Sequence, residues 1–232
     1  MEYTPGHEKL MEKTLTLYDS TLGKKAVLAV TGLMLFGFVI GHMLGNLQVF
    51  LGPDAMNDYA IKLHSLGGLL WVVRAILLGA LLLHIMMVAQ LYSRSLAARG
   101  VRYKVKKSIA TTYAASTMWL SGVLLLLFVV YHLAHFTVPG VPMGNYEHLG
   151  YQHVYTNVIN GFSVPWVVAI YVAAQVVLGM HLSHGAWSRM QTLGFSHPRY
   201  DGRKKQIARG LAALIVIGNI SIPLAVLAGI VR

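Results

Sequence analysis

Five long apolar runs limit what this chain can fold into. A bilayer core of about 30 Å requires about 20 apolar residues in a helix, and in lipid only helices and closed barrels satisfy the hydrogen bonds of the backbone. The runs predict membrane helices at about residues 26–50, 67–92, 108–137, 163–187 and 207–231. We therefore expect an all-α membrane protein, a bundle of five transmembrane helices, with residues 1–232 forming a single membrane domain.

Composition favours a membrane protein over a soluble or nucleic-acid-binding one. Of the 232 residues, 56% are hydrophobic and only 12% are charged, whereas soluble domains average about 25% charged residues. The formal charge is +11, but Lys and Arg lie in short clusters between apolar runs, which argues against nucleic acid as a partner. The chain has no Cys, which excludes an iron–sulfur cluster, a c-type haem and a disulfide within it.

The distribution of cations predicts the orientation of the bundle. Only Lys62, Arg74 and Arg232 fall on one side of the predicted helices. Because cytoplasmic loops carry the excess of Lys and Arg, residues 1–25 are expected to form a cytoplasmic N-terminal segment, with the C-terminus outside. The sixteen cations on the cytoplasmic side are Lys9, Lys13, Lys24, Lys25, Arg94, Arg99, Arg102, Lys104, Lys106, Lys107, Arg189, Arg199, Arg203, Lys204, Lys205 and Arg209.

The first apolar run carries glycines at every fourth position. Gly37, Gly41 and Gly45 would form one small-residue face on a helix. In lipid such a face permits close contact with another helix. A flat macrocycle pressed against the same face is the other interpretation, and the two do not exclude each other.

Histidines inside the predicted helices are the main functional signal, because an ionisable side chain in a bilayer is costly and usually marks a function. Counted inward at 1.5 Å per residue, His42 and His132 lie about 15 and 16 residues from the cytoplasmic ends of their helices. His84 and His181 lie about 5 and 4 residues from theirs. These histidines form two pairs at matched depths, about 11 residues or roughly 16 Å apart.

Two imidazoles that face each other at one depth can supply both axial bonds of a haem iron. The pairs therefore predict two b-type haems, an inner one and an outer one, as a path for electrons. A zinc site would need its ligands at one depth. A proton relay would normally recruit Asp or Glu within the helices, and all eight acidic residues lie outside them.

Other polar residues near the pairs are candidates for contacts with haem propionates. His135 and His184 each follow a paired histidine by three residues and lie nearer to water, where propionates point. Ser188 and Arg189 are placed to assist on the inner side, and Arg74 on the outer side. The alternative for the two histidines is simple hydration at the headgroup layer.

Several short motifs together resemble the membrane-anchor cytochrome b subunit of succinate dehydrogenase and fumarate reductase. The resemblance is to the single-chain, five-helix, two-haem type, and it extends from Leu17 to Arg232. Its specificity lies in the order and depth of the motifs. They are Gly-His-Met-Leu-Gly-Asn at 41–46, Tyr131-His132 with His135, His-Leu-Ser-His-Gly at 181–185 followed by Ser188, and Gln-Thr-Leu-Gly at 191–194.

The resemblance implies that His84 and His181 bind the proximal haem and that His42 and His132 bind the distal one. It also implies a flavoprotein subunit and an iron–sulfur subunit on the cytoplasmic face of the cell inner membrane, as in respiratory complex II of the tricarboxylic acid cycle. Some two-haem members carry a glutamate close to the haem ligand of the fourth helix. Residues 177–180 read Val-Leu-Gly-Met, so a proton pathway of that type is not expected.

A quinone, expected to be menaquinone, would be the membrane partner. Its carbonyls need hydrogen-bond donors and a proton source reachable from water. Polar residues at the outer ends of the first two helices offer a site, with Glu147 and His148 able to close over it. The site residues are Asn46, Gln48, Asp58, Lys62 and His64.

Two alternatives stay open at this stage. One is a cytochrome b anchor for another quinone-linked dehydrogenase, such as a hydrogenase or formate dehydrogenase. The other is a haem-free transporter or scaffold, a class in which internal repeats and broken helices are common. The basic inner loops offer a surface for anionic lipid and for the peripheral subunits, and a higher oligomer of the complex is possible.

Overall fold

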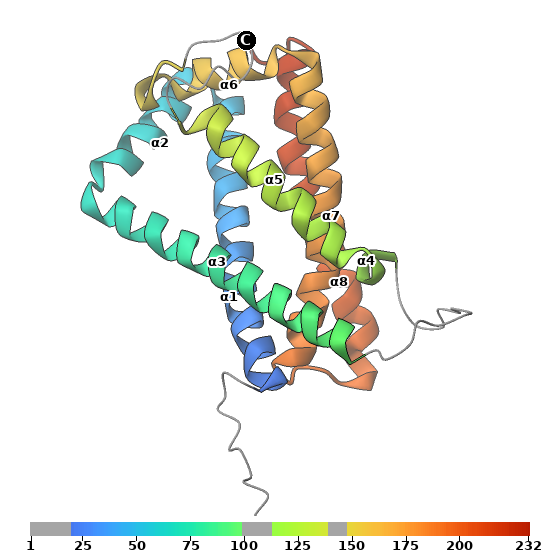
Figure 1. The fold of residues 1–232 in the computed structure, drawn as a ribbon. Coiled ribbons are helices and arrows are strands. Elements are labelled where there is room, and N and C mark those ends of the chain that lie inside the picture. Colours follow the sequence, from blue (N-terminus) through green and yellow to red (C-terminus); the bar gives the residue numbers. More distant parts are fainter. Residues whose placement is uncertain (1–19, 99–112, 139–147) are drawn as a thin grey trace, which may run out of the picture.

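The computed structural model describes residues 20–98, 113–138 and 148–232, and in these ranges every regular element is helical (Figure 1). Several sequence features lie outside the described residues. Among them are the start of the third predicted helix at residue 108 and most of the basic segment that precedes it. The others are His7, Lys9, Lys13, Pro139, Pro142 and Glu147.

Within the described residues five helices are long and apolar enough to cross a membrane, in agreement with the five predicted spans. Large apolar side chains remain exposed along them, as expected for a multi-pass protein whose solvent is lipid. The spans are α1 (Thr21–Asn46, continued by the 3-10 turn η1, Leu47–Leu51), α3 (Gly68–Ala97), α5 (Met118–Phe136), α7 (Pro165–Thr192) and α8 (Pro198–Leu227).

At one end of the bundle the helices run beyond their predicted limits. Helices α3 and α7 continue to Ala97 and Thr192, and α8 begins at Pro198 rather than at 207. Lys, Arg and Gln are good helix formers, so a helix need not stop where the lipid does. Proline at the first position of α8, where an N–H is not needed, favours the early start.

The opposite end carries short helices where the sequence predicts loops. Helix α2 (Pro53–Ser65), η2 (Tyr151–His153) and α6 (Val154–Phe162) lie across this end (Figure 1). They are joined by side chains, since Asn57 Oδ1 accepts the Tyr155 amide at 3.0 Å. The prediction of loops at this end is therefore wrong in part. Segments too short to span the membrane still form helices here, and these helices cap the bundle.

The third predicted helix is also interrupted. A short α4 (Tyr113–Ser116) is separated from α5 at Thr117. The hydroxyls of Ser116 and Thr117 both donate to the Tyr113 carbonyl, at 2.8 and 2.9 Å. Side-chain hydroxyls compete with the backbone for such carbonyls, which accounts for the break.

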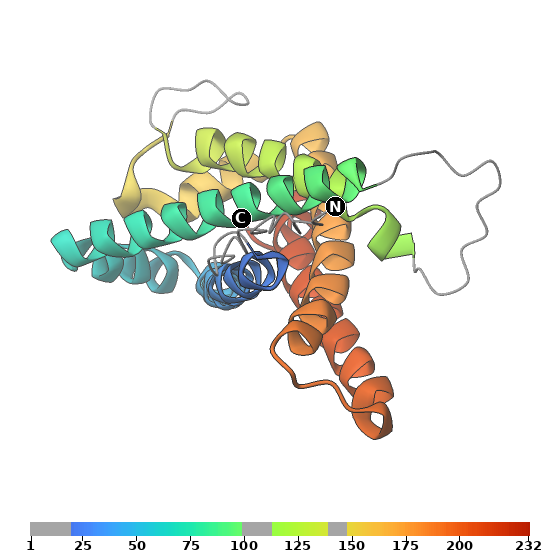
Figure 2. The same ribbon diagram turned by 60° about the horizontal axis from the view of Figure 1, so that its bottom comes forward.

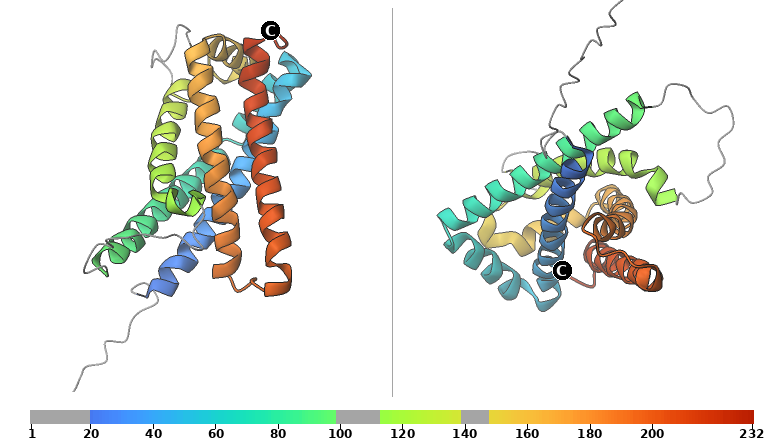
Figure 3. Two further views of the ribbon diagram at one scale, coloured as in Figure 1. Left: turned by 90° about the vertical axis from the view of Figure 1, so that its right-hand side faces the viewer. Right: turned by 90° about the horizontal axis from the view of Figure 1, so that it is seen from below.

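Helix α1 is central to the bundle. It contacts α3 on one side and α7 and α8 on the other, as Figure 2 shows. Helices α7 and α8 form an antiparallel hairpin, and α5 packs on α7. Helix α3 crosses α1 obliquely, so the two are close over only part of their lengths (Figure 3). The start of α1 and the C-terminus lie at opposite ends of the bundle (Figure 1).

Glycines allow close helix contacts at one of the expected positions and at others. A Cβ on Gly45, near the end of α1, would lie 2.8 Å from the Tyr59 ring of α2, which agrees with the expected helix contact. A Cβ on Gly179 of α7 would lie 2.7 Å from Val216 Cγ2, and one on Gly218 of α8 would lie 2.6 Å from Met43 Sδ. In contrast, Gly37 and Gly41 of α1 have open space where a Cβ would point. The helix-contact interpretation is therefore wrong for these two.

We expect Gly179→Leu to destabilise the α7–α8 hairpin by about 1–3 kcal/mol, because Val216 is stiff and cannot move away. The measurement is the Tm of the purified protein in detergent. Gly210→Leu is the matched control, since a Cβ at Gly210 meets nothing within 4 Å. An equal loss of Tm in both variants would contradict the close contact.

Candidate functional site

The outer pair of histidines comes together in the bundle. His42 of α1 and His132 of α5 have ring centroids 5.6 Å apart and ring planes at 84°. Phe38 stacks on His42 one turn away, with a centroid distance of 5.4 Å. Two helices that are far apart in the chain thus present imidazoles to each other at one level.

A tyrosine hydroxyl links His132 to a third histidine. Tyr171 of α7 lies 3.1 Å from His132 Nδ1 and 2.9 Å from His135 Nδ1. The one hydroxyl hydrogen can go to only one of these rings, so the other ring must donate its own Nδ1–H. With Nδ1 engaged, His132 retains Nε2 for a further bond.

Aromatic rings enclose the outer level on the side of α5, α6 and α7. His135 is only 3% exposed and Tyr171 only 6%. Gly161 of α6 makes room for this packing, because a Cβ there would lie 3.0 Å from Phe136 and 3.1 Å from His135. The enclosing rings are Phe128, Tyr131, Phe136, Phe162 and Tyr171.

The inner histidines are each held by a hydroxyl from a neighbouring helix. His84 Nδ1 of α3 lies 3.3 Å from Thr31 Oγ1 of α1, and His181 Nδ1 of α7 lies 3.1 Å from Ser121 Oγ of α5. The inner level therefore uses four helices, with one histidine or one hydroxyl from each.

On three helices, the residues of the two levels are separated by nearly the same number of positions. On α1, Thr31 and His42 are about 11 residues apart, and on α5 so are Ser121 and His132, which is roughly 16 Å in a helix. On α7, Tyr171 and His181 are about 10 residues apart, or roughly 15 Å. The equal spacing of hydroxyl and histidine on α1 and α5 is visible in the sequence, and our sequence analysis missed it.

Arg189 of α7 lies beside the inner level. A Cβ on Gly32 of α1 would sit 2.5 Å from Arg189 Nη1 and 3.1 Å from His84 Cε1, so the missing side chain of Gly32 makes room for the guanidinium. The guanidinium carbon also lies 5.5 Å from the centroid of the Phe36 ring. Arg189 thus places a positive charge close to His84, near the end of α7 that carries the basic residues.

The carboxylates of the described residues lie elsewhere. Asp54 and Asp58 are on α2 at the opposite end of the bundle. Asp201 accepts hydrogen bonds from the Ser196 hydroxyl and the His197 amide at the start of α8. An anionic partner for Arg189 would therefore come from outside the described residues.

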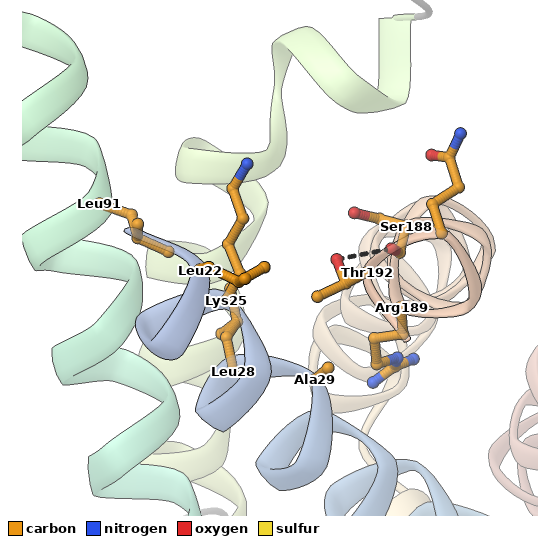
Figure 4. Close-up of a pocket in the computed structure, with 9 residues that line it drawn as sticks. Leu22, Lys25, Leu28, Ala29, Leu91, Ser188, Arg189 and Thr192 are labelled. Atoms are coloured by element: carbon orange, nitrogen blue, oxygen red, sulfur yellow. Dashed lines mark hydrogen bonds between the residues drawn. The ribbon is translucent and has the colours of Figure 1, made fainter. Parts of the chain in front are cut away.

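A cavity of about 530 Å³ opens beside Arg189 between α1, α3 and α7 (Figure 4). It combines two cations and hydroxyls with apolar walls, and Thr192 Oγ1 donates to the Ser188 carbonyl at 3.0 Å within it. Such a lining suits an anionic group attached to an apolar body. The lining residues are Leu22, Lys25, Leu28, Ala29, Leu91, Ser188, Arg189, Gln191 and Thr192.

The other residues predicted to contact haem propionates are more dispersed. His184 lies near His181 but does not line the cavity. The Arg74 guanidinium stacks on Trp71 at 4.9 Å, and no contact with the outer histidine pair is seen for it within the described residues. His135 is the predicted outer propionate contact that is linked to that pair, because it shares the Tyr171 hydroxyl with His132.

The predicted quinone residues share the outer end of the bundle without forming a cluster in the described part of the chain. Asn46 and Gln48 lie where α1 passes into η1, and Asp58 and Lys62 are exposed on α2. His64 stacks on Tyr151, with ring centroids 4.0 Å apart. Its Nδ1 donates to the Ala60 carbonyl at 2.9 Å, which leaves Nε2 open.

The residues at both levels fit a flat, iron-bearing macrocycle. His42 is exposed in the middle of a span, and His84, His132 and His181 are half-buried, so none of the four rings is fully enclosed by other side chains. Next to His42, Gly41 leaves the helix surface bare. An apolar groove of about 540 Å³ runs between α1 and α3 and is lined in part by Thr31. Paired neutral imidazoles are suitable axial ligands for low-spin iron.

Comparison with known proteins gives no further guide to the site. The chain matches no protein-family model, no curated protein and no solved structure. Its function is therefore inferred from the residues and their geometry.

We expect Tyr171→Phe to lower the free energy of unfolding by about 1–3 kcal/mol, because two buried imidazole nitrogens lose their shared partner. Tyr155→Phe is the matched control, since Tyr155 donates to the Arg232 carbonyl at the exposed end of the bundle. The Tm of each purified variant measures the effect. The shared hydrogen bond would be contradicted if the two variants melted alike.

Proposed function

We propose that this protein is the diheme cytochrome b membrane anchor of a succinate:quinone oxidoreductase. The observation that carries the proposal is the arrangement of four histidines in two levels, each level drawn from different helices and separated by roughly 16 Å along α1 and α5. His84 and His181 would bind the inner haem, and His42 and His132 the outer one. The chain would be an enzyme subunit for electron transfer, with no dicarboxylate site of its own.

Bound haem iron would supply reversible one-electron redox chemistry at each level. The chain's own residues would bind and orient the group through the four imidazoles. Hydroxyls contact three of these rings, those of His84, His181 and His132, at Nδ1, so Nε2 is the nitrogen of those three that would bind iron. Arg189 would neutralise a propionate of the inner haem, and Ser188, which lines the same cavity, would donate a hydrogen bond to it. His135 is proposed for the outer haem, and Arg74 and His184 stay secondary candidates.

The proposed cytoplasmic face is the end where α1 begins. The α7–α8 hairpin extends there and carries Arg199, Arg203, Lys204 and Lys205. Lys205 lies 4.8 Å from the centroid of the Trp187 ring, and Lys204 donates to the Phe195 carbonyl. These cations would attract anionic lipid and the flavoprotein and iron–sulfur subunits. The cell inner membrane is the proposed location, with this end of the bundle facing the cytoplasm.

The proposed quinone site lies at the outer end, between η1 and α2. Asn46, Gln48 and Lys62 supply donors for a carbonyl, and Asp58 offers a carboxylate on the exposed face of α2. His64 accepts at Nε2 when neutral, since its Nδ1 donates to Ala60. It would accept from a quinol hydroxyl or, once protonated, donate to a quinone carbonyl. Menaquinone is the proposed species.

A visible spectrum of the purified complex tests the proposal. We expect a reduced-minus-oxidised spectrum of b-type haem, two haems per chain by pyridine haemochrome, and reduction by succinate. Reduction by formate or hydrogen but not by succinate would assign the anchor to another quinone-linked dehydrogenase. A complex without haem would leave a membrane scaffold or transporter and refute the cytochrome proposal.

Substitution of single ligands tests the two levels separately. We expect His84→Ala to remove the inner haem alone and His42→Ala to remove the outer haem alone, each leaving one haem per chain. Haem content and the midpoint potential of the retained haem are the measurements. His153→Ala is the control, since that residue lies in an exposed turn far from both pairs. Loss of both haems from a folded, assembled variant would contradict independent pairs.

A further inference from the structure

We propose that Thr31 and Ser121 hold the inner histidines in one tautomer, with hydrogen on Nδ1 and the lone pair on Nε2. The proposal rests on the diheme function proposed above and assigns to these hydroxyls a role in setting the inner iron site. They act as positioning residues, because each contacts a proposed ligand and not the iron itself.

At Thr31 the hydroxyl hydrogen is already committed. Thr31 Oγ1 donates to the Val27 carbonyl at 2.8 Å and lies 3.3 Å from the Leu28 carbonyl, both in the preceding turn of α1. Its oxygen therefore faces His84 Nδ1, at 3.3 Å, with lone pairs only. A hydrogen bond between the two requires that His84 be the donor.

Ser121 repeats this arrangement on another helix. Its hydroxyl donates to the Met118 carbonyl at 3.0 Å, and its oxygen lies 3.1 Å from His181 Nδ1. Ser121 is only 4% exposed, so water cannot readily take its place. His181 must therefore also donate from Nδ1, and both inner rings present Nε2 as a lone pair.

Among the described residues, the outer level is held by a different arrangement. Tyr171 shares one hydroxyl between His132 and His135, so either ring can be the donor. The two levels thus differ in how firmly the protein fixes the tautomer of its histidines. At the inner level the tautomer is fixed, because each hydroxyl donates its hydrogen to a carbonyl of its own helix.

The fixed tautomer has two physical consequences. A ligand histidine that donates from its other nitrogen has a defined ring orientation and a more basic coordinating nitrogen. A more basic ligand stabilises ferric iron, so the hydrogen bonds lower the midpoint potential of the inner haem. Because both rings are already in the binding tautomer, no proton needs to move when haem binds.

The experiment uses Thr31→Val, which keeps the side-chain shape and removes the hydroxyl, and Ser121→Ala on the second helix. In the purified complex we expect the affinity for inner haem to fall roughly 10–100-fold. The inner haem that remains should show a higher midpoint potential and a shifted low-spin EPR signal, while the outer haem is unchanged. Thr31→Ser keeps a hydroxyl at this position and should therefore give the wild-type values.

Ser221→Ala is the control, because Ser221 donates only to the Gly218 carbonyl of its own helix. The inner haem is identified as the one lost in His84→Ala. If wild-type complex holds two haems, and Thr31→Val and Ser121→Ala leave inner haem content, potential and EPR signal unchanged, the tautomer role is overturned while the diheme function stands. If wild-type complex holds no haem, the diheme function itself fails.

Discussion

In the hydrocarbon layer a polar group without a partner is costly, and most of the internal organisation of this bundle follows from that constraint. Four imidazoles of the spans contact hydroxyls of neighbouring helices: His84 contacts Thr31, His181 contacts Ser121, and His132 and His135 share Tyr171. Each such bond fixes the depth and rotation of one helix relative to another, because the hydroxyl and the ring must meet at one level. The bonds therefore couple α3 to α1 and α5 to α7 while leaving space around the rings.

That space depends on glycine used in two ways. Gly179 and Gly218 bring α8 against α7 and α1, so the α7–α8 hairpin and α1 form the tightly packed side of the bundle. Gly32 admits the Arg189 guanidinium beside His84, and Gly41 leaves bare surface next to His42. A close-packed side and an open side are what a protein needs if it is to hold a flat, rigid ligand between helices without first moving them.

The depth count from the sequence paired the histidines although it misplaced the helix ends. Helices α3 and α7 both overrun their predicted limits at the same end, so the relative depth of His84 and His181 was preserved. On α1 and α5 the observed starts differ from prediction in opposite directions. His42 and His132 still meet, because the level of a residue in the bundle depends on how the helices pack and not on where each helix begins.

The sequence by itself determined the number of spans and the helical class, because a bilayer accepts little except long apolar helices. It also determined that His42 and His132 meet at one level, because position along a helix is proportional to residue number. Only the tertiary structure decided which side chains hold the inner histidines, since Thr31 and Ser121 are ordinary helix residues until α3 and α7 are placed beside them. It alone also placed Arg189 over Gly32, because contacts between helices depend on rotation and crossing angle, which no periodicity in one helix can specify.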